Sequence, residues 1–324
     1  MALSDKEATA FGLLAMYAED MYTVGSLNPP ADPRIAAAGW AIEGYLTAHD
    51  AVFPPKDAPQ QRLSVNPTSR VFFGFVARSN ADPSSHVAVI RGTDGMVEWV
   101  IDAEFRLIPH PRHMTVQVEQ GFWNIYQTMS LADPQTGATT YQNAAEGVAN
   151  TVGTGTVVVV GHSLGSALAT YFTDDLAERL GSRASACLFA SPRTGDAAWA
   201  ALFASEVTGG YRLINYLLDI VTHVPTLFYA TLPNPTVIQP ATAQAAIRLD
   251  IFCNHHVICY CAMIDYADTM AAPTTPQDAS CKACIGPPPM SDAAKGLASL
   301  INDFGVGDER AVVMLKALHT VSTM

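Results

Sequence analysis

The fold is decided by residues 156–165, which read TVVVVGHSLG, and by the helical pattern that follows them. The run of valines is short, apolar and β-branched, as expected of a buried strand in a parallel sheet. After the turn, large apolar residues return at every fourth position, at Leu168, Phe172, Leu176 and Leu180. This spacing predicts an amphipathic helix, so the stretch has the order strand, G-x-S-x-G, helix that is typical of a nucleophile elbow.

Ser163 occupies the centre of the G-x-S-x-G motif. Glycine is needed at Gly161 and Gly165, because side chains there would clash where the helix approaches the strand. We expect the Ser163 hydroxyl to stand above the sheet, and the N–H of Leu164 to point toward a developing oxyanion. The motif alone is a weak signal, but the flanking strand and helix favour the catalytic interpretation over an ordinary turn.

Length and composition indicate a large globular core, because 49% of the 324 residues are hydrophobic. We predict one α/β domain with appended segments. Its parts are a core at about residues 65–270, a helical N-terminal segment at residues 1–64 and a Cys-containing C-terminal extension at residues 271–324. Within the N-terminal segment, a second helix is predicted from about Pro33 to His49.

The net charge of −12, with no cluster of Lys and Arg, weighs against nucleic-acid binding and against electrostatic docking to anionic membranes. No apolar run reaches the length of a membrane span. The N-terminus shows no basic-then-apolar signal region.

Five of the six cysteines fall between residues 253 and 284. An even count clustered late in the chain favours disulfides in a secreted protein, although the lack of a visible signal peptide leaves a cytoplasmic location open. A zinc site built from the last four cysteines is the alternative, but their spacing is not a standard zinc-finger pattern. Cys187 lies in an apolar run and is expected to be a buried free thiol.

Runs rich in Val, Ile and Phe predict the other strands, at residues 70–78, 86–91, 186–190 and 211–218. Helical stretches between the later strands argue for a mostly parallel sheet covered on both faces, whereas residues from about Leu227 to Ala246 are predicted as a long loop. Ligands bind at the carboxyl ends of the strands in such a sheet, and both Ser163 and Asp219 fall there.

A serine hydroxyl needs a base, usually a histidine oriented by a carboxylate, and the chain order in this kind of fold is Ser, acid, His. Asp219 ends a predicted strand and is the candidate acid, with Asp174 and Asp196 as alternatives. The histidines after Asp219 are His223, His255, His256 and His319. His223 is too close to Asp219 in sequence and His319 falls in a predicted terminal helix, so the candidate base is His255 or His256.

Together these segments resemble the class 3 lipases, the fungal-lipase-like branch of the α/β hydrolases. The matching segments are residues 89–93, 98–102, 118–122, 161–165, 190–196, 215–225 and 255–260. The resemblance implies an α/β-hydrolase fold and a triad of Ser163, Asp219 and a histidine, with no cofactor or metal. It also implies that Thr93 and Leu164 donate to the oxyanion. Thr93 fits this role by itself, because it ends an apolar strand just before a turn signal.

The resemblance further favours His255 over His256 as the base, because related enzymes often place the histidine five residues before a tyrosine, as His255 stands to Tyr260. A shorter spacing in fungal members keeps His256 open. One departure is Glu119, with Gln120 beside it, where the family often has a histidine before Gly-Phe.

A mobile lid at about Gly95–Phe105 is also implied. Its apolar side, at helical spacing, consists of Met96, Val97, Val100, Ile101 and Phe105, with Trp99 beside them. Such a helix would cover the acyl site in water and open at a lipid surface, whereas a fixed helix packed on the sheet is the alternative.

These patterns predict a serine carboxylic ester hydrolase, and specifically a lipase acting on triacylglycerol or other apolar acyl esters through an acyl-enzyme. The alternatives are an esterase for feruloyl, polyester or acetyl substrates, and a non-catalytic binding protein with the same fold. The expected partner is an ester or lipid substrate, at a lipid–water interface where the lid operates. The sequence leaves the oligomeric state open.

Overall fold

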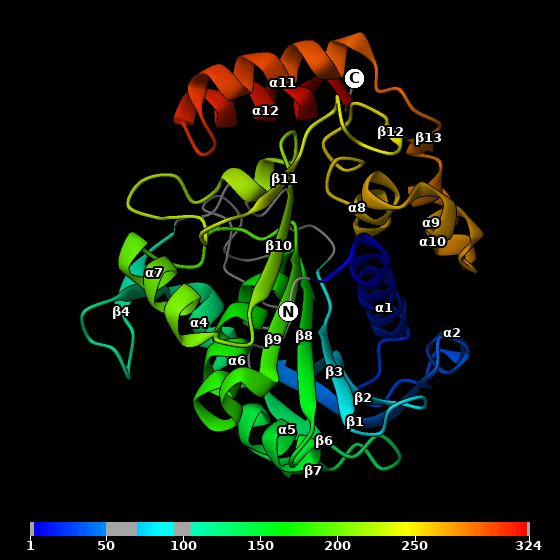
Figure 1. Cartoon of the computed structure of the whole chain (residues 1–324), viewed down its shortest axis with the longest axis vertical. Helices are drawn as coiled ribbons and strands as arrows, with labels where there is room; N and C mark the ends of the chain where they lie inside the picture. Colours follow the sequence, from blue (N-terminus) through cyan, green and yellow to red (C-terminus); the bar gives the residue numbers. More distant parts are fainter. Residues whose placement is uncertain (1–2, 50–69, 94–104, 323–324) are drawn as a thin grey trace, which may run out of the picture.

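A mixed sheet runs through the middle of the molecule with helices on both sides (Figure 1). The computed structural model describes residues 3–49, 70–93 and 105–322. Within them, the strands of the main sheet are β1 (Trp40–His49), β2 (Arg70–Ser79), β3 (Ser85–Ile90), β6 (Ser130–Ala132), β7 (Thr139–Tyr141), β8 (Thr156–His162), β9 (Ala184–Phe189), β10 (Tyr211–Tyr216) and β11 (Thr236–Ile238). Their spatial order is β11-β10-β9-β8-β3-β2-β1-β6-β7.

The half of the sheet from β3 to β11 is parallel, and the half from β3 to β7 is antiparallel. In the parallel half, Ile90 pairs with Gly161 and Gly161 pairs with Leu188, so β3, β8 and β9 end side by side. The predicted α/β class, a sheet with helices on both faces, is confirmed. The carboxyl ends of these strands carry the elbow.

Helices cover the two faces of the sheet unequally (Figure 1). On one side lie α1 (Asp5–Tyr22) and α8 (Val257–Ile264), and on the other lie α4 (Gln120–Tyr126), α5 (Ala144–Val152), α6 (Leu164–Leu180) and α7 (Ala197–Glu206). The start of α1 is fixed by a capping box, in which Ser4 accepts from the Glu7 N–H and the Glu7 carboxylate accepts from Ser4.

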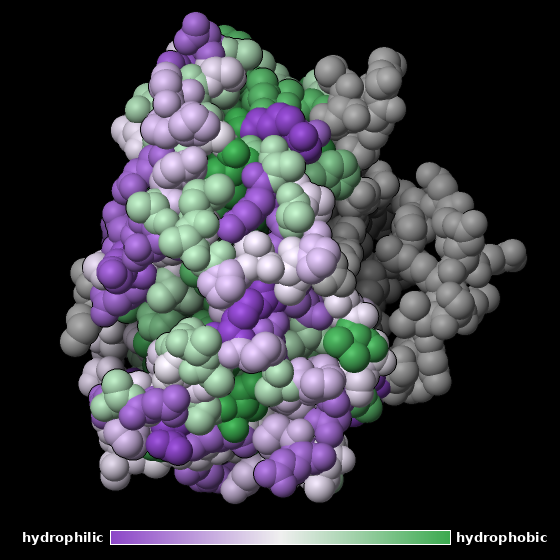
Figure 2. Space-filling model, turned by 90° about the vertical axis from the view of Figure 1, so that its right-hand side faces the viewer, coloured by the Kyte–Doolittle hydropathy of each residue, from purple (hydrophilic) through white to green (hydrophobic). Residues whose placement is uncertain are grey.

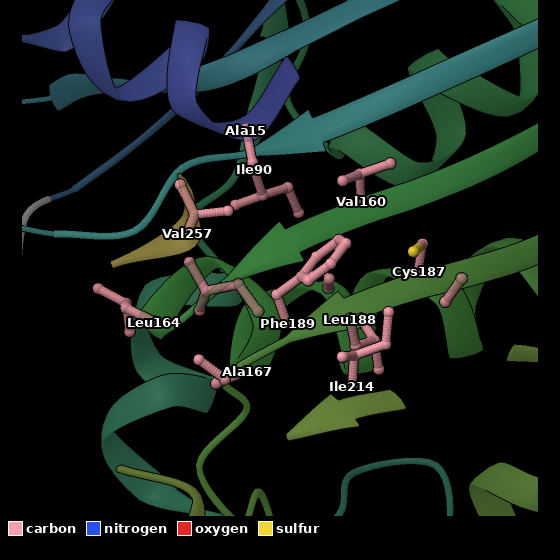
Figure 3. Close-up of a cluster of buried hydrophobic side chains, with 14 of the residues drawn as sticks. Ala15, Ile90, Val160, Leu164, Ala167, Cys187, Leu188, Phe189, Ile214 and Val257 are labelled. Atoms are coloured by element: carbon pink, nitrogen blue, oxygen red, sulfur yellow. The ribbon is translucent and has the colours of Figure 1, made fainter. Parts of the chain in front are cut away.

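The core reaches from α1 through the sheet to α6. Figure 3 shows Ala15 of α1 beside Ile90 of β3 and Val257 of α8, with Val160 and Phe189 on the neighbouring strands. All five side chains are buried. Burying a valine, isoleucine or phenylalanine side chain stabilises the folded state by roughly 1.5–3 kcal/mol, so α1 and α8 are held firmly against the strand ends.

The C-terminal extension packs around the ends of the sheet. Its elements are α10 (Pro276–Lys282), β13 (Ile285–Gly286), α11 (Asp292–Phe304) and α12 (Glu309–Ser322). The helix α9 (Tyr266–Ala271) leads into it, and the short strand β12 (Ala246–Ile247) pairs with β13. The turn between α11 and α12 reaches η3 (Ile220–His223), where the Gly307 N–H donates to Nδ1 of His223 at 3.1 Å.

Two predictions about individual elements are wrong. The second N-terminal helix is limited to α2 (Pro33–Ala37), and the rest of the predicted helix is β1, so the segment 1–64 is not wholly helical. Gly39, with φ +86°, separates them, and pairing with both β2 and β6 outweighs the local helical pattern. The predicted loop from Leu227 to Ala246 contains β11, which extends the parallel sheet through β10.

The smaller elements are β4 (Leu107–Pro109), β5 (Gln117–Glu119) and η2 (Gly181–Arg183). Figure 2, which turns the side of α2 and α9 toward the viewer, shows a mosaic of hydrophilic and hydrophobic residues. Among the helices in the described residues, none combines the length and apolar character that crossing a bilayer requires.

Candidate active site

Ser163 sits at a strained point between β8 and α6. Its φ is +59°, a left-handed value that is uncommon for a residue with a side chain. The two flanking glycines permit this turn: a Cβ on Gly161 would lie 2.4 Å from the carbonyl oxygen of Gly165, and one on Gly165 would lie 2.2 Å from that of Ile90. The expected clash of a side chain at Gly161 or Gly165 is therefore confirmed by the backbone contacts.

A chain of hydrogen bonds joins Ser163 to a histidine and an aspartate. Nε2 of His255 lies 2.7 Å from Oγ of Ser163, and Nδ1 of His255 lies 2.8 Å from Oδ2 of Asp219. All three residues are buried. Because a carboxylate only accepts, the Nδ1–H of His255 donates to Asp219, which leaves Nε2 free to accept the serine proton.

Asp219 is held by contacts on both of its oxygens. Oδ1 accepts from the Val221 N–H at 2.9 Å, as the cap of η3. Oδ2 accepts from the Tyr260 hydroxyl at 2.7 Å, and that hydroxyl in turn accepts from the Tyr216 N–H at 2.9 Å. The role of Tyr260 as a donor to the acid was not predicted from the sequence, where it served only as a spacing marker.

The loop that carries His255 is tied to three distant parts of the chain. The Asn254 side chain donates to the Leu218 carbonyl at 3.1 Å, and Cys253 forms a disulfide with Cys284 of the C-terminal extension. Nε2 of His162 lies 2.8 Å from the backbone oxygen of His255. The base is therefore positioned by the segment that follows β10, by the elbow and by the C-terminal extension.

Comparison with known families identifies the core that carries this site. Residues 87–229 match the model of the family described as Lipase (class 3). Residues 87–229 belong to the class 3 lipase family. The matched range contains Ser163 and Asp219, and His255 follows it.

Two plant proteins are similar in sequence to this chain. Phospholipase A1-IIgamma of Arabidopsis thaliana is 34% identical over 131 residues, covering 33% of this chain and 30% of that protein. Phospholipase A1-II 3 of Oryza sativa subsp. indica is 26% identical over 224 residues, covering 60% of this chain and 52% of that protein. The chain thus spans about half of the rice protein's length, and less of the Arabidopsis protein's.

Two solved structures share the fold of this chain. A member of a family of fungal lipases known for an unusual buried polar cluster is 22% identical, with a TM-score of 0.52 over 76% of this chain and 84% of that chain. The protein MDLA of Penicillium cyclopium is 23% identical, with a TM-score of 0.51 over 74% and 80%. At these identities the likeness concerns the fold alone.

The candidate oxyanion donors, Leu164 and Thr93, follow the ends of the paired strands β8 and β3. Leu164 is the first residue of α6, where backbone N–H groups have no partner within the helix. Thr93 follows the end of β3, which pairs with β8. The predicted lid residues Met96, Val97, Trp99, Val100 and Ile101 lie outside the described residues.

The other acids and histidines weighed in the sequence have different surroundings. His256 is the N-cap residue of α8, and burial, with the nearby His255, lowers its pKa to about 4. His223 donates from Nε2 to the Leu217 carbonyl at 2.9 Å, and its pKa is lowered by burial. Asp174 pairs with Arg112, and Asp196 caps α7. The side chain of His319 lies outside the described residues.

Glu119 stands where the family often has histidine, and it is buried at the start of α4. Its Oε2 accepts from the Phe122 N–H at 2.7 Å. Burial raises the pKa of Glu119 to about 7, against the effect of these backbone donors. Glutamate therefore caps a helix at this position.

The cysteines divide into one disulfide and four thiols. Cys253 and Cys284 are bonded, and Cys187, Cys259, Cys261 and Cys281 are free. Cys187 is buried, as expected, and burial raises the pKa of its thiol to about 12. Among the described residues, no group of three or more His, Cys, Asp or Glu side chains is arranged to hold a metal ion.

Proposed function

We propose that this chain is a serine carboxylic ester hydrolase, a lipase that cleaves lipid acyl esters. The observation that carries the proposal is the chain of hydrogen bonds from Ser163 Oγ through His255 to Asp219, at 2.7 and 2.8 Å. It supplies a nucleophile with a base in reach and a carboxylate that orients the base, which are the requirements for activating a serine.

The proposed reaction has two halves. His255 takes the proton of Ser163 as the hydroxyl attacks the ester carbonyl, and the N–H groups of Thr93 and Leu164 donate to the resulting oxyanion. His255 then gives the proton to the leaving alcohol, which leaves an acyl-enzyme. A water molecule, activated by the same histidine, releases the acid and restores the serine.

The class of substrate follows from relatives rather than from the site. The family is one of lipases, and the two plant relatives are named phospholipase A1. Triacylglycerols and phospholipids are therefore the two lipid classes to compare. Non-lipid esters and a purely binding role are the competing proposals.

A chain-length series decides among these proposals. We expect hydrolysis of p-nitrophenyl esters from acetyl to palmitoyl, and faster release of fatty acid from emulsified triacylglycerol or phosphatidylcholine than from a feruloyl ester. A fluorophosphonate probe should label Ser163. Ser163→Ala should abolish both activity and labelling, whereas Ser166→Ala, at a buried serine of the same helix, should retain both. If the wild-type protein hydrolyses none of these esters, the proposal of an ester hydrolase is wrong and the binding role is favoured.

A further inference from the structure

Glu19, in the last turns of α1, contacts the elbow through a single oxygen. Its Oε1 lies 2.8 Å from Nδ1 of His162, the motif residue before the candidate nucleophile, and accepts from the Gly92 N–H at 3.2 Å. His162 is buried, and its Nε2 lies 2.8 Å from the backbone oxygen of His255. One pair of side chains therefore joins α1 to the end of β3, to the elbow and to the loop of the candidate base.

The donors and acceptors determine the protonation of this pair. The His255 carbonyl only accepts, so Nε2 of His162 must carry a proton and donate it. Oε1 of Glu19 accepts from Gly92, and an ionised Glu19 can only accept at that oxygen, so Nδ1 of His162 then donates to it as well. His162 is then an imidazolium and Glu19 a carboxylate.

The pKa values of the two residues shift in the directions this assignment requires. Burial alone lowers the pKa of His162, but the charge and hydrogen bond of Glu19 outweigh it and raise the pKa. Burial alone raises the pKa of Glu19, but His162 outweighs it and lowers the pKa. Asp219 and His256 also act on the pair, and the ring of His255 lies 5.0 Å away, centroid to centroid.

We propose that Glu19 and His162 form a positioning ion pair, which holds the backbone of His255 and of Gly92 in the geometry that ester hydrolysis needs. The inference rests on the proposed function and adds two residues that touch neither substrate nor reacting atoms. Displacement of a catalytic group by about 1 Å can cost roughly 100-fold in rate, so a contact that fixes the carbonyl of the base has catalytic weight.

The next residue of α1 supplies a matched control. Asp20 pairs with Arg34, which also contacts Asp278 of α10 at 2.9 Å. This second pair ties α1 to α2 and to the C-terminal extension, and Arg34 is buried, as His162 is. If α1 merely has to dock on the sheet, breaking either pair should lower activity. If Glu19 positions the base, only breaking the Glu19–His162 pair should do so.

The test compares Glu19→Gln with Asp20→Asn on a soluble short-chain ester. Glutamine keeps an accepting oxygen but carries no charge to balance a protonated His162, so we expect kcat to fall about 10- to 100-fold with KM within about twofold. Asp20→Asn should lower the melting temperature but keep kcat within about twofold of wild type. His162→Gln removes the bridge to His255 by another route. The double variant Glu19→Gln/His162→Gln should lose no more kcat than the worse of the two single variants.

A second readout does not depend on activity. In ¹⁵N-histidine spectra recorded over a pH series, the His162 ring should keep protons on both nitrogens to a higher pH in wild type than in Glu19→Gln. Failure of the proposed function would leave this signal intact. A neutral His162 in wild type, or equal kcat losses in Glu19→Gln and Asp20→Asn that follow their melting temperatures, would overturn the inference.

Discussion

The elbow that presents Ser163 and the loop that presents His255 meet at two hydrogen bonds, one to Ser163 and one from His162, but they are built differently. The elbow is fixed by its own backbone, because Gly161 and Gly165 let strand and helix approach within distances that no Cβ would allow. The loop is fixed from outside, by the Leu218 carbonyl, the His162 ring and the disulfide to Cys284. The nucleophile is thus a local feature of the chain, and the base is a product of long-range contacts.

The largest effect expected from breaking the loop side is that of His255→Ala. Removing the residue that would take the serine proton should lower kcat by about 10⁵- to 10⁶-fold, close to the loss from removing the serine itself. His256→Ala should keep most of the activity, because the hydrogen-bond chain runs through its neighbour. Steady-state kinetics of the two variants on one short-chain ester make the measurement. The reverse result would transfer the base to His256.

Asp219→Asn should follow, with kcat lower by about 10⁴-fold. An asparagine amide placed at the Nδ1 side would donate where the carboxylate accepts, and the imidazole would then present Nε2–H rather than a lone pair to Ser163. Asp196→Asn is the control, since Asp196 accepts from the Trp199 N–H at 2.7 Å and caps α7 instead. A loss below tenfold for Asp219→Asn would point to a different acid.

The contrast between the two regions explains what could be predicted from the sequence. The elbow could be recognised because ten consecutive residues contain both its strand and its turn. The contacts of the loop could not, because Glu19 and His162 are 143 residues apart and Cys253 and Cys284 are 31 apart. No local pattern marks Glu19, which reads as one acid on the polar face of a helix.

The same reason accounts for the errors in the fold. The parallel strands are continuous apolar runs, so β8 and β9 are visible in the sequence alone. Residues 40–49 have no such run, and they become β1 only because β2 and β6 pair with them on both sides. The place of β11 at the sheet edge likewise depends on its pairing with β10.

Replacing the disulfide should sharpen the comparison on the side of stability. In the chain-entropy model, a cross-link closing a loop of this length contributes about 3–4 kcal/mol to the free energy of unfolding. The double variant Cys253→Ala/Cys284→Ala should lose about that much in urea unfolding. Cys281→Ser, at a partly buried free thiol, should change it little. Equal stability of the two variants would show that the loop is held without the cross-link.

His256 should make the stability of the loop depend on pH. Burial first, and then His255, lowers its pKa from 6.5 to about 4, so the unfolded chain binds a proton more readily than the folded one. The stabilisation is complete above pH 6.5 and is lost as the pH falls toward 4, by at most about 3 kcal/mol. His256→Asn should unfold with a flatter dependence between pH 7 and pH 4. Parallel curves for wild type and variant would contradict the assignment.

The smallest effect concerns Tyr260, which follows the loop of His255 and contacts the candidate acid Asp219. Its hydroxyl donates to Asp219 at 2.7 Å and accepts from the Tyr216 N–H at 2.9 Å. Tyr260→Phe removes only that oxygen. The Tyr216 N–H then lacks its acceptor, and the Asp219 carboxylate has one donor fewer. We expect a loss of about 1–2 kcal/mol in stability and about tenfold in kcat.

Tyr171→Phe is the matched control, because the Tyr171 hydroxyl is equally buried and donates at 2.6 Å to the Thr194 carbonyl instead. It should lose similar stability and keep kcat. If both variants keep kcat, Tyr260 only supports the fold; if only Tyr260→Phe loses it, the tyrosine orients the acid.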